Sequence, residues 1–228
     1  ISIGFVGWAS FPLGPGPDAQ AALQSDEKVS IDIIQGWTVF QPIENTPETG
    51  FIFYPGGRVD YRSYSPVLNS LAQQGFLVIL VPMPLSMAVF SPNKAETVLT
   101  TFPKIQNWAI GGHSLGGAMA ARYCFTHPDQ IQGLALWASY PPSTDNLANQ
   151  NLEVLSIFGD QDGQVEKLES SGQLLPPDTV WVKIDGGNHA QFGDYGLQPG
   201  DGQAQISSRE QWSQILDATS TLLLKISE

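Results

Sequence analysis

The chain has little of several residue types on which whole classes of protein depend. It contains 1 cysteine and 3 histidines in 228 residues. A single cysteine excludes an internal disulfide and any metal site built from several cysteines. Cys124 lies within an apolar segment, which predicts a buried thiol that fills space and takes no part in chemistry. We therefore expect no metal centre.

Positive charge is also scarce. The sequence has 10 lysine and arginine residues against 22 aspartate and glutamate residues, which gives a formal net charge of −12. A protein so negative repels phosphate backbones, which argues against nucleic acid as a partner. Because 42% of the residues are hydrophobic and 14% are charged, the composition indicates an ordered globular protein.

Long hydrophobic runs are missing after the N-terminal segment, and no later stretch approaches the ~20 apolar residues that span a bilayer. Residues 1–13 are mostly apolar and end at the breakers Pro15, Gly16 and Pro17. Two interpretations stay open. The segment is the end of a removed signal peptide or membrane anchor, which implies an extracytoplasmic or membrane-anchored protein, or it is an apolar arm packed on a cytoplasmic domain. We expect residues 1–27 to form this arm and residues 28–228 to form a single domain.

Apolar runs alternate with segments of helical spacing along the remainder of the chain. Runs rich in β-branched and aromatic residues predict strands at 28–34, 37–41, 50–54, 76–81, 108–111, 133–137, 153–158 and 180–184. Helical spacing predicts helices at 64–74, 91–102 and 118–127, and a closing helix from the capping box at 207–210 to residue 223. Continuous apolar strands between helices are typical of an α/β fold with a mostly parallel central sheet and helices on both faces.

One glycine-rich turn lies between a predicted strand and a predicted helix. Residues 112–117 read Gly-His-Ser-Leu-Gly-Gly, a G-x-S-x-G motif in the strand–turn–helix context where it indicates a nucleophile. Gly112 and Gly116 lack Cβ atoms, so strand and helix can approach closely around Ser114. The helix N-terminus directs amide N–H groups toward any oxyanion that forms. Ser114 is therefore the predicted nucleophile, although the motif alone also fits a structural turn.

A serine nucleophile needs a base, and the few histidines allow a choice by elimination. His113 precedes the serine and its side chain leaves the strand on the opposite side, which favours a structural role. His127 ends the predicted helix after the turn, far from the serine. His189 follows the last predicted strand, at the carboxyl edge of the sheet where the nucleophile turn also opens. We predict that His189 is the base.

The acid that orients the base is expected after the preceding strand. Asp160 and Asp162 both follow the strand 153–158. Asp160 comes first and suits a role in shaping the turn. Asp162 lies further into the loop, where its side chain can turn back toward His189. We favour Asp162, and Asp160 stays as the alternative.

Two main-chain N–H groups are needed to bind a developing oxyanion. One is the amide of Leu115, the residue after the nucleophile. The other is expected in the loop after the strand 50–54, where Gly57 lets the backbone approach the substrate closely. Arg58 beside it either forms a surface ion pair with Asp60 or contacts the substrate.

The chain order of serine, aspartate and histidine, together with four segments, resembles the α/β-hydrolase superfamily over residues 50–226. The segments are FYPGGRVD, GGHSLGG, FGDQDG and GGNHAQFGDYG. Within the superfamily, the chain is similar to the dienelactone-hydrolase-like or "family 5" enzymes, which have no large cap domain. The resemblance implies their fold and a hydrolase activity without a cofactor. The catalytic and oxyanion residues that it implies are Ser114, Asp162, His189, Gly57 and Leu115.

Two features depart from the pattern of that family. Pro55 replaces the histidine that is common before the oxyanion glycines, which affects the second oxyanion donor. The nucleophile is a serine, whereas true dienelactone hydrolases use a cysteine, so their substrate is not implied.

The sequence predicts a serine hydrolase that cleaves a small-molecule carboxylic ester through an acyl-enzyme intermediate. Residues 138–151 are too few for a helical lid, so the site is expected to be open unless residues 85–91 fold over it. Candidate substrate contacts are Arg58, Tyr61, Tyr140 and Phe192. Acyl transfer and the cleavage of thioesters or peptides use the same residues and stay as alternatives. A binding protein that retains the fold without catalysis is a further alternative. No feature of the sequence predicts the oligomeric state.

Overall fold

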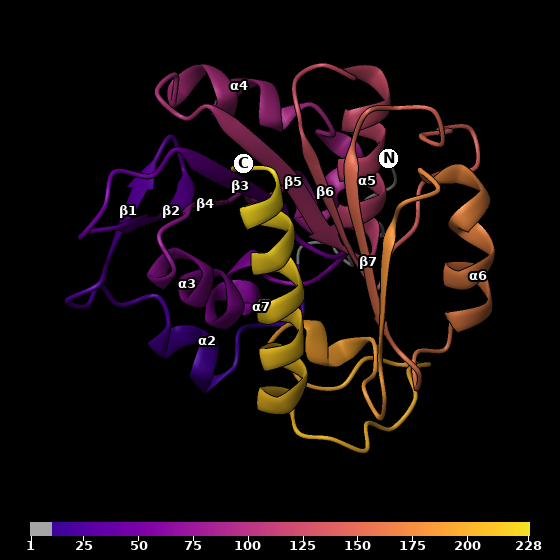
Figure 1. Cartoon of the computed structure of the whole chain (residues 1–228). Coiled ribbons are helices and arrows are strands. Elements are labelled where there is room, and N and C mark those ends of the chain that lie inside the picture. Colours follow the sequence, from indigo (N-terminus) through magenta and orange to yellow (C-terminus); the bar gives the residue numbers. More distant parts are fainter. Residues whose placement is uncertain (1–10) are drawn as a thin grey trace.

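The computed structural model of the chain describes residues 11–228. Within that range, an eight-stranded sheet has the strand order β1-β2-β4-β3-β5-β6-β7-β8 (Figure 1). The strands are β1 (Val29–Ile34), β2 (Trp37–Pro42), β3 (Thr49–Tyr54), β4 (Leu77–Leu80), β5 (Asn107–His113), β6 (Gly133–Trp137), β7 (Glu153–Gly159) and β8 (Val180–Ile184). All eight predicted strands are therefore confirmed, with ends shifted by a few residues.

The sheet is mostly parallel. β1 and β2 form an antiparallel hairpin, and β2 pairs antiparallel with β4. The remaining neighbours, from β4 through β3 to β8, all pair in parallel. Because parallel neighbours end at the same edge, the loops after β3, β5, β7 and β8 meet at the carboxyl edge of the sheet.

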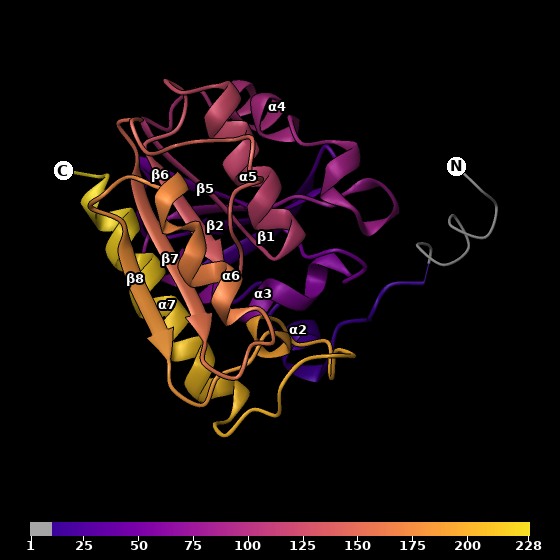
Figure 2. The same cartoon turned by 90° about the vertical axis from the view of Figure 1, so that its right-hand side faces the viewer.

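Helices cover both faces of the sheet, as predicted. Residues alternate along β3, so that Phe51 and Phe53 pack in one apolar cluster and Ile52 and Tyr54 pack in the other. The first cluster includes side chains of α3 (Ser65–Gln73) and α7 (Ser208–Lys225), and the second includes side chains of α4 (Lys94–Thr101) and α5 (Leu115–Thr126). Figure 2 shows α7 and α5 on opposite sides of the sheet.

The structure adds short helices that periodicity did not predict. They are α2 (Pro17–Ala21) and α6 (Val165–Ser170), with 3-10 turns at Tyr61–Tyr64, Pro84–Ser86, Ala88–Phe90, Ser171–Leu174 and Ala190–Phe192. All of them are too short to show a helical period. Two predicted helix starts were wrong. α4 begins at Lys94 rather than at 91, because a turn precedes it, and α5 begins at Leu115 rather than at 118.

The predicted capping box of the closing helix is confirmed. The hydroxyl of Ser207 accepts a hydrogen bond from the amide of Glu210, and the Glu210 carboxylate accepts one from the amide of Ser207. Both bonds satisfy amides that have no partner within a helix. The last turn of α7 is tied to β7, because Lys225 forms an ion pair with Glu153 at 2.5 Å.

The described part of the N-terminal arm packs on the domain. The amide of Leu13 donates to the carbonyl of Arg58, and the amide of Asp60 donates to the carbonyl of Leu13. Ala19 in α2 is fully buried. Residues 1–10, which make up most of the proposed signal or anchor segment, lie outside the described residues. Among residues 11–228, no helix combines the length and apolarity that a bilayer crossing requires.

Candidate active site

The predicted nucleophile turn, residues 112–117, connects the end of β5 to the start of α5. Ser114 has φ 51° and ψ −120°, a conformation that non-glycine residues adopt at an energetic cost. A Cβ atom on Gly116 would lie 2.2 Å from the carbonyl oxygen of Tyr54, and one on Gly112 would lie 2.6 Å from the carbonyl carbon of Gly116. Since real Cβ atoms do not approach backbone so closely, the turn requires glycine at both positions.

The backbone of Ser114 is held from both sides of the turn. Its amide donates to the carbonyl of Trp137 at 3.0 Å, which continues the pairing of β5 with β6. Its carbonyl accepts from the Ser139 hydroxyl at 2.6 Å and from the Ala118 amide at 3.1 Å. Ser114 itself lines a pocket of about 230 Å³, so its side chain borders open space.

His189 lies close to this turn and against Asp162. Its Nδ1 is 2.6 Å from Oδ2 of Asp162, and the two side chains are 3% and 1% exposed. The imidazole ring is 4.4 Å from the ring of His113, the residue before the serine. Nε2 of His189 is buried and has no hydrogen-bond partner among the described residues. One ring nitrogen is therefore held by a carboxylate while the other is unengaged.

The structure brings Asp162, and not Asp160, to the imidazole. The second oxygen of Asp162, Oδ1, accepts from the amide of Gln164 at 2.8 Å. Asp160 is exposed, and its Oδ1 accepts from the amide of Gly186 at 2.7 Å. Asp160 thus shapes the turn after β7, in the role that the sequence suggested for it.

Gly57 and Leu115 lie next to each other. A Cβ atom built on Gly57 would be 3.6 Å from the Cβ of Leu115 and 3.4 Å from Sδ of Met87. The two flanking amides of the loop are engaged, since Gly56 donates to the Tyr64 hydroxyl and Arg58 donates to the Ser86 carbonyl.

The amide of Gly57 has no hydrogen-bond partner within residues 11–228. The amide of Leu115 is the first of α5 and has no helical acceptor. Two uncommitted donors therefore lie beside the nucleophile turn. The segment 84–90 borders this loop through Met87, so part of the region expected to fold over the site does approach it.

A buried hydrogen-bond network joins the loop of Gly57 to the imidazole of His113. The Tyr64 hydroxyl accepts from the Gly56 amide at 3.0 Å and lies 2.9 Å from Nδ1 of His113. The hydroxyl proton is therefore available to Nδ1. Burial, with the neighbouring His189 as a second cause, holds the pKa of His113 well below its usual value. His113 is therefore neutral at pH 7.

Asp201 and Gln211 hold the histidine loop in place. The Asp201 carboxylate accepts from the amides of His189 at 3.1 Å, Ala190 at 2.7 Å and Gly202 at 2.9 Å. Gln211 of α7 is fully buried and exchanges two hydrogen bonds with the backbone of Asn188. Sequence reasoning missed both residues, because Asp201 is one of several aspartates in a polar loop. A polar residue on the buried face of α7 was the available signal for Gln211.

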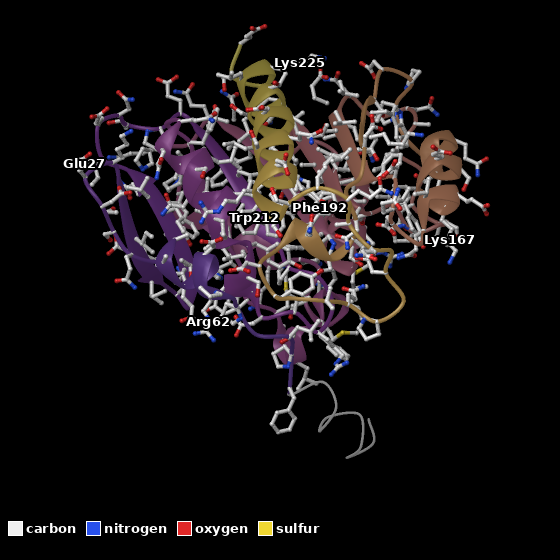
Figure 3. The ribbon with its side chains drawn as sticks, turned by 90° about the horizontal axis from the view of Figure 1, so that it is seen from below. Glu27, Arg62, Lys167, Phe192, Trp212 and Lys225 are labelled. Carbon is white, nitrogen blue, oxygen red and sulfur yellow. The ribbon has the colours of Figure 1, made fainter. Side chains whose placement is uncertain are left out.

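The candidate substrate contacts have different surroundings. Tyr140 lines the same pocket as Ser114. Phe192 is fully buried and stacks on His113 with the ring centroids 5.5 Å apart, so in this structure it packs against His113. It lies near the middle of Figure 3, which views the molecule from the carboxyl edge of β7 and β8. Tyr61 is half-buried against the core.

The proposed ion pair between Arg58 and Asp60 was wrong. Asp60 binds Arg62 instead, at 2.6 Å, because the first turn after Asp60 brings the Arg62 side chain back over the carboxylate. Arg58 has φ 58° and donates from its guanidinium to the carbonyl of Phe11 at 3.2 Å. Its contact with substrate stays a prediction.

The loop after β6 leaves the carboxyl edge of the sheet accessible. Residues 138–152 connect β6 to β7 without a helix, so no large cap covers the carboxyl edge.

Cys124 is buried, as predicted, and burial raises the pKa of its thiol. Among residues 11–228, no cluster of three or more histidine, cysteine, aspartate or glutamate side chains is suited to a metal ion.

The fold and the glycine-bounded turn define an α/β-hydrolase, and comparison with known proteins supports this class. The profile of the alpha/beta hydrolase family matches residues 50–213. The chain therefore belongs to the alpha/beta hydrolase family. No curated protein matches it by sequence.

Solved structures share its fold at low identity. A dienelactone hydrolase from Anabaena variabilis superposes with a TM-score of 0.62 at 18% identity, covering 88% of this chain and 99% of that one. A predicted CIB-like hydrolase from Thermoplasma acidophilum gives 0.59 at 14% identity, with 86% and 98% covered. Carboxyl esterase 2 from the fungus Tuber melanosporum gives 0.59 at 12% identity, with 91% of each chain covered. At these identities the likeness shows the fold alone, which is the predicted one.

Proposed function

We propose that the protein is a serine hydrolase that cleaves carboxylic esters through an acyl-enzyme intermediate. The observation that carries the proposal is the state of the His189 imidazole: Nδ1 is 2.6 Å from a buried carboxylate, while Nε2 is unengaged beside the turn that bears Ser114. Such an imidazole has its proton fixed on Nδ1 and a lone pair on Nε2, as a general base requires. The names of two similar folds, a dienelactone hydrolase and a carboxyl esterase, agree with ester cleavage.

The first half of the reaction acylates the serine. Nε2 of His189 takes the proton of the Ser114 hydroxyl as its oxygen attacks the ester carbonyl carbon. The carbonyl oxygen becomes an oxyanion, which the amides of Gly57 and Leu115 bind. The bond to the alcohol oxygen then breaks, and His189 gives its proton to that oxygen as the alcohol leaves.

The second half releases the acid. Water enters the place of the alcohol and gives a proton to Nε2 of His189 as it attacks the acyl carbon. The same two amides bind the second oxyanion, and the proton returns to Ser114 as the carboxylic acid leaves. Throughout, Asp162 holds the imidazole in one tautomer and stabilises its charged form.

The proposal is tested with p-nitrophenyl acetate and the Ser114→Ala variant. In comparable triads, loss of the serine lowers kcat on the order of a millionfold. Ser143→Ala is the matched control, because Ser143 is exposed and lies outside the pocket. A fluorophosphonate probe should label the wild type and the Ser143→Ala variant but not the Ser114→Ala variant. Hydrolysis that survives in Ser114→Ala, or a folded wild type that is neither active nor labelled, would overturn the proposal.

A further inference from the structure

The pocket beside Ser114 is small and uncharged. Its volume is about 230 Å³, below the ~300–1,000 Å³ of pockets that enclose drug-sized ligands. The lining residues are Ser114, Leu115, Ala118, Ala138, Ser139, Tyr140 and Gln164. None of these carries a formal charge. The pocket is therefore shaped for a short neutral group that is attached to the reacting carbon.

The position of the pocket decides which half of an ester it receives. The oxygen of the departing alcohol must lie within reach of Nε2 of His189, since that atom protonates it. No residue of the loop 186–192 lines the pocket, which instead lies between the first turns of α5, the loop after β6 and the residue before α6. The alcohol therefore leaves on the side of His189, and the pocket takes the acyl chain.

One wall of the pocket is formed by Tyr140 and Gln164, which are joined by a hydrogen bond. The Tyr140 hydroxyl donates to Oε1 of Gln164 at 3.3 Å. The main-chain amide of Gln164 donates to Oδ1 of Asp162 at 2.8 Å, which fixes the position of Gln164. The wall is thus anchored to the carboxylate that orients the proposed base. A carboxylate on the acyl chain would meet the negative charge of Asp162 nearby, within a protein of net charge −12.

We infer that the preferred substrates are esters of short, uncharged acids, and that Ala118 and the Tyr140–Gln164 pair set the limit of chain length. This inference rests on the proposed function. A methylene group occupies roughly the ~30 Å³ that a water molecule takes in the liquid. A pocket of about 230 Å³ therefore holds fewer than about eight such groups even when completely filled. Acetyl and butyryl chains fit with room to spare, whereas the seven carbons beyond the carbonyl of an octanoyl group would have to fill the pocket almost completely, which a single extended chain does not do.

The experiment compares p-nitrophenyl acetate, butyrate and octanoate with wild type and three variants. One methylene in a hydrophobic pocket changes kcat/KM by about 10–200-fold. Wild type should cleave the octanoate at least about tenfold less efficiently than the butyrate. Ala118→Leu fills the pocket, so the butyrate-to-acetate ratio should fall by about tenfold or more. Tyr140→Ala removes the wall, so the octanoate-to-butyrate ratio should rise about tenfold. Phe125→Leu is the control, because Phe125 lies on α5 outside the pocket and is 38% exposed.

A separate comparison of two esters tests charge selectivity. Ethyl butyrate and the monoethyl ester of succinic acid have acyl chains of equal carbon number, and acid release in a pH-stat should be faster for the neutral ester. If Ala118→Leu does not fold, Ala118→Val takes its place, with the same expected direction.

The outcomes separate this inference from the proposed function. If activity depends on Ser114 but octanoate is cleaved as well as butyrate, or Ala118→Leu leaves the ratio unchanged, the acyl pocket is wrong and the hydrolase mechanism stands. A faster reaction of the charged ester would contradict the neutral preference alone. If the wild type cleaves no ester in the series and Ser114 stays unlabelled, both proposals fall together.

Discussion

The two sides of the candidate site are held in place by different means. On the nucleophile side, Gly112, Ser114 and Gly116 are neighbours in sequence, and their arrangement follows from backbone atoms that touch where Cβ atoms are missing. On the histidine side, His189 is positioned by side chains of Asp162 and Asp201, 27 and 12 residues away in the sequence.

This difference predicts which property of the protein a substitution on each side should change. Backbone contacts leave no alternative arrangement, so a side chain at Gly112 or Gly116 disrupts the packing of α5 against β5 and β3 and hence the fold. Side-chain hydrogen bonds hold an otherwise irregular loop, so a substitution on the histidine side displaces one imidazole and leaves the core intact. Substitution of these two glycines should lower stability, and substitution on the histidine side should lower activity.

The largest effect on the histidine side is expected from Asp162→Asn. An amide can donate to Nδ1 of the imidazole and so favour the wrong tautomer, and in a comparable triad this change lowers kcat about 10⁴-fold. The free energy of unfolding should change far less, because the amide fills the same volume. Steady-state kinetics with p-nitrophenyl acetate and urea unfolding measure the two quantities.

Asp160→Asn is the matched control for this variant. Asp160 lies two residues away on the same turn and binds the amide of Gly186 rather than the imidazole. Replacement of the Asp160 carboxylate by an amide should leave kcat near the wild-type value. A larger loss of kcat in Asp160→Asn than in Asp162→Asn would reverse the assignment of the acid.

The next largest effect is expected on the nucleophile side, from Gly116→Ala. The new Cβ atom would lie 2.2 Å and 2.4 Å from the carbonyl oxygens of Tyr54 and Pro55. Overpacking of this kind costs about 1–3 kcal/mol and occasionally more, and here backbone must move, so we expect the upper end or a failure to fold. Thermal unfolding and soluble yield measure it. Gly14→Ala, where no atom lies within 4 Å of the new Cβ, should match wild type. Equal stability of the two variants would remove the distinction between the two sides.

The same difference explains how much the sequence could predict. The eight strands, the nucleophile turn and the capping box of α7 depend on residues close together, and all were predictable from periodicity and glycine spacing. The choice of Asp162 over Asp160 rested on how far a side chain can turn back, and the hydrogen bond to His189 agrees with it.

What could not be predicted depends on distant partners. Nothing in the sequence near Asp201 shows that its carboxylate meets the amide of His189, because the loop between them has no regular period. From the sequence, Tyr64 was predicted only to lie in a helix, although its hydroxyl joins Gly56 to His113. The segment α6, six residues long, was too short to give a helical signal.

A smaller effect is expected from Asp201→Ala, which leaves three main-chain N–H groups without their acceptor. An unsatisfied buried group costs about 1–3 kcal/mol, and a displacement of about 1 Å at a catalytic group can cost about 10²-fold in rate. We expect kcat to fall on that order while KM is nearly unchanged, because Asp201 does not line the pocket beside Ser114.

The conservative variant Asp201→Asn distinguishes positioning from general destabilisation. The amide keeps one acceptor oxygen for the amides of His189 and Gly202 and should restore part of kcat. Kinetics of both variants, set beside their free energies of unfolding, provide the test. A loss in KM alone, or no rescue by asparagine at equal stability, would contradict the positioning role.

The smallest effect concerns pH and the neutral state of His113. Its pKa lies well below 6.5 in the folded protein because the ring is buried, whereas in the unfolded chain it is about 6.5. Below that pH, the unfolded state binds a proton that the folded state does not, so the free energy of unfolding falls by up to ~1.4 kcal/mol per pH unit as the solution is acidified. This part of the pH dependence should be absent from His113→Asn and present in Tyr64→Phe, which keeps the buried imidazole. Urea unfolding at pH 7.5 and pH 5 should show a drop that is roughly 1–2 kcal/mol larger for wild type than for His113→Asn. Equal drops would mean that His113 carries its proton in the folded protein, and the network from Gly56 to His113 would then be charged.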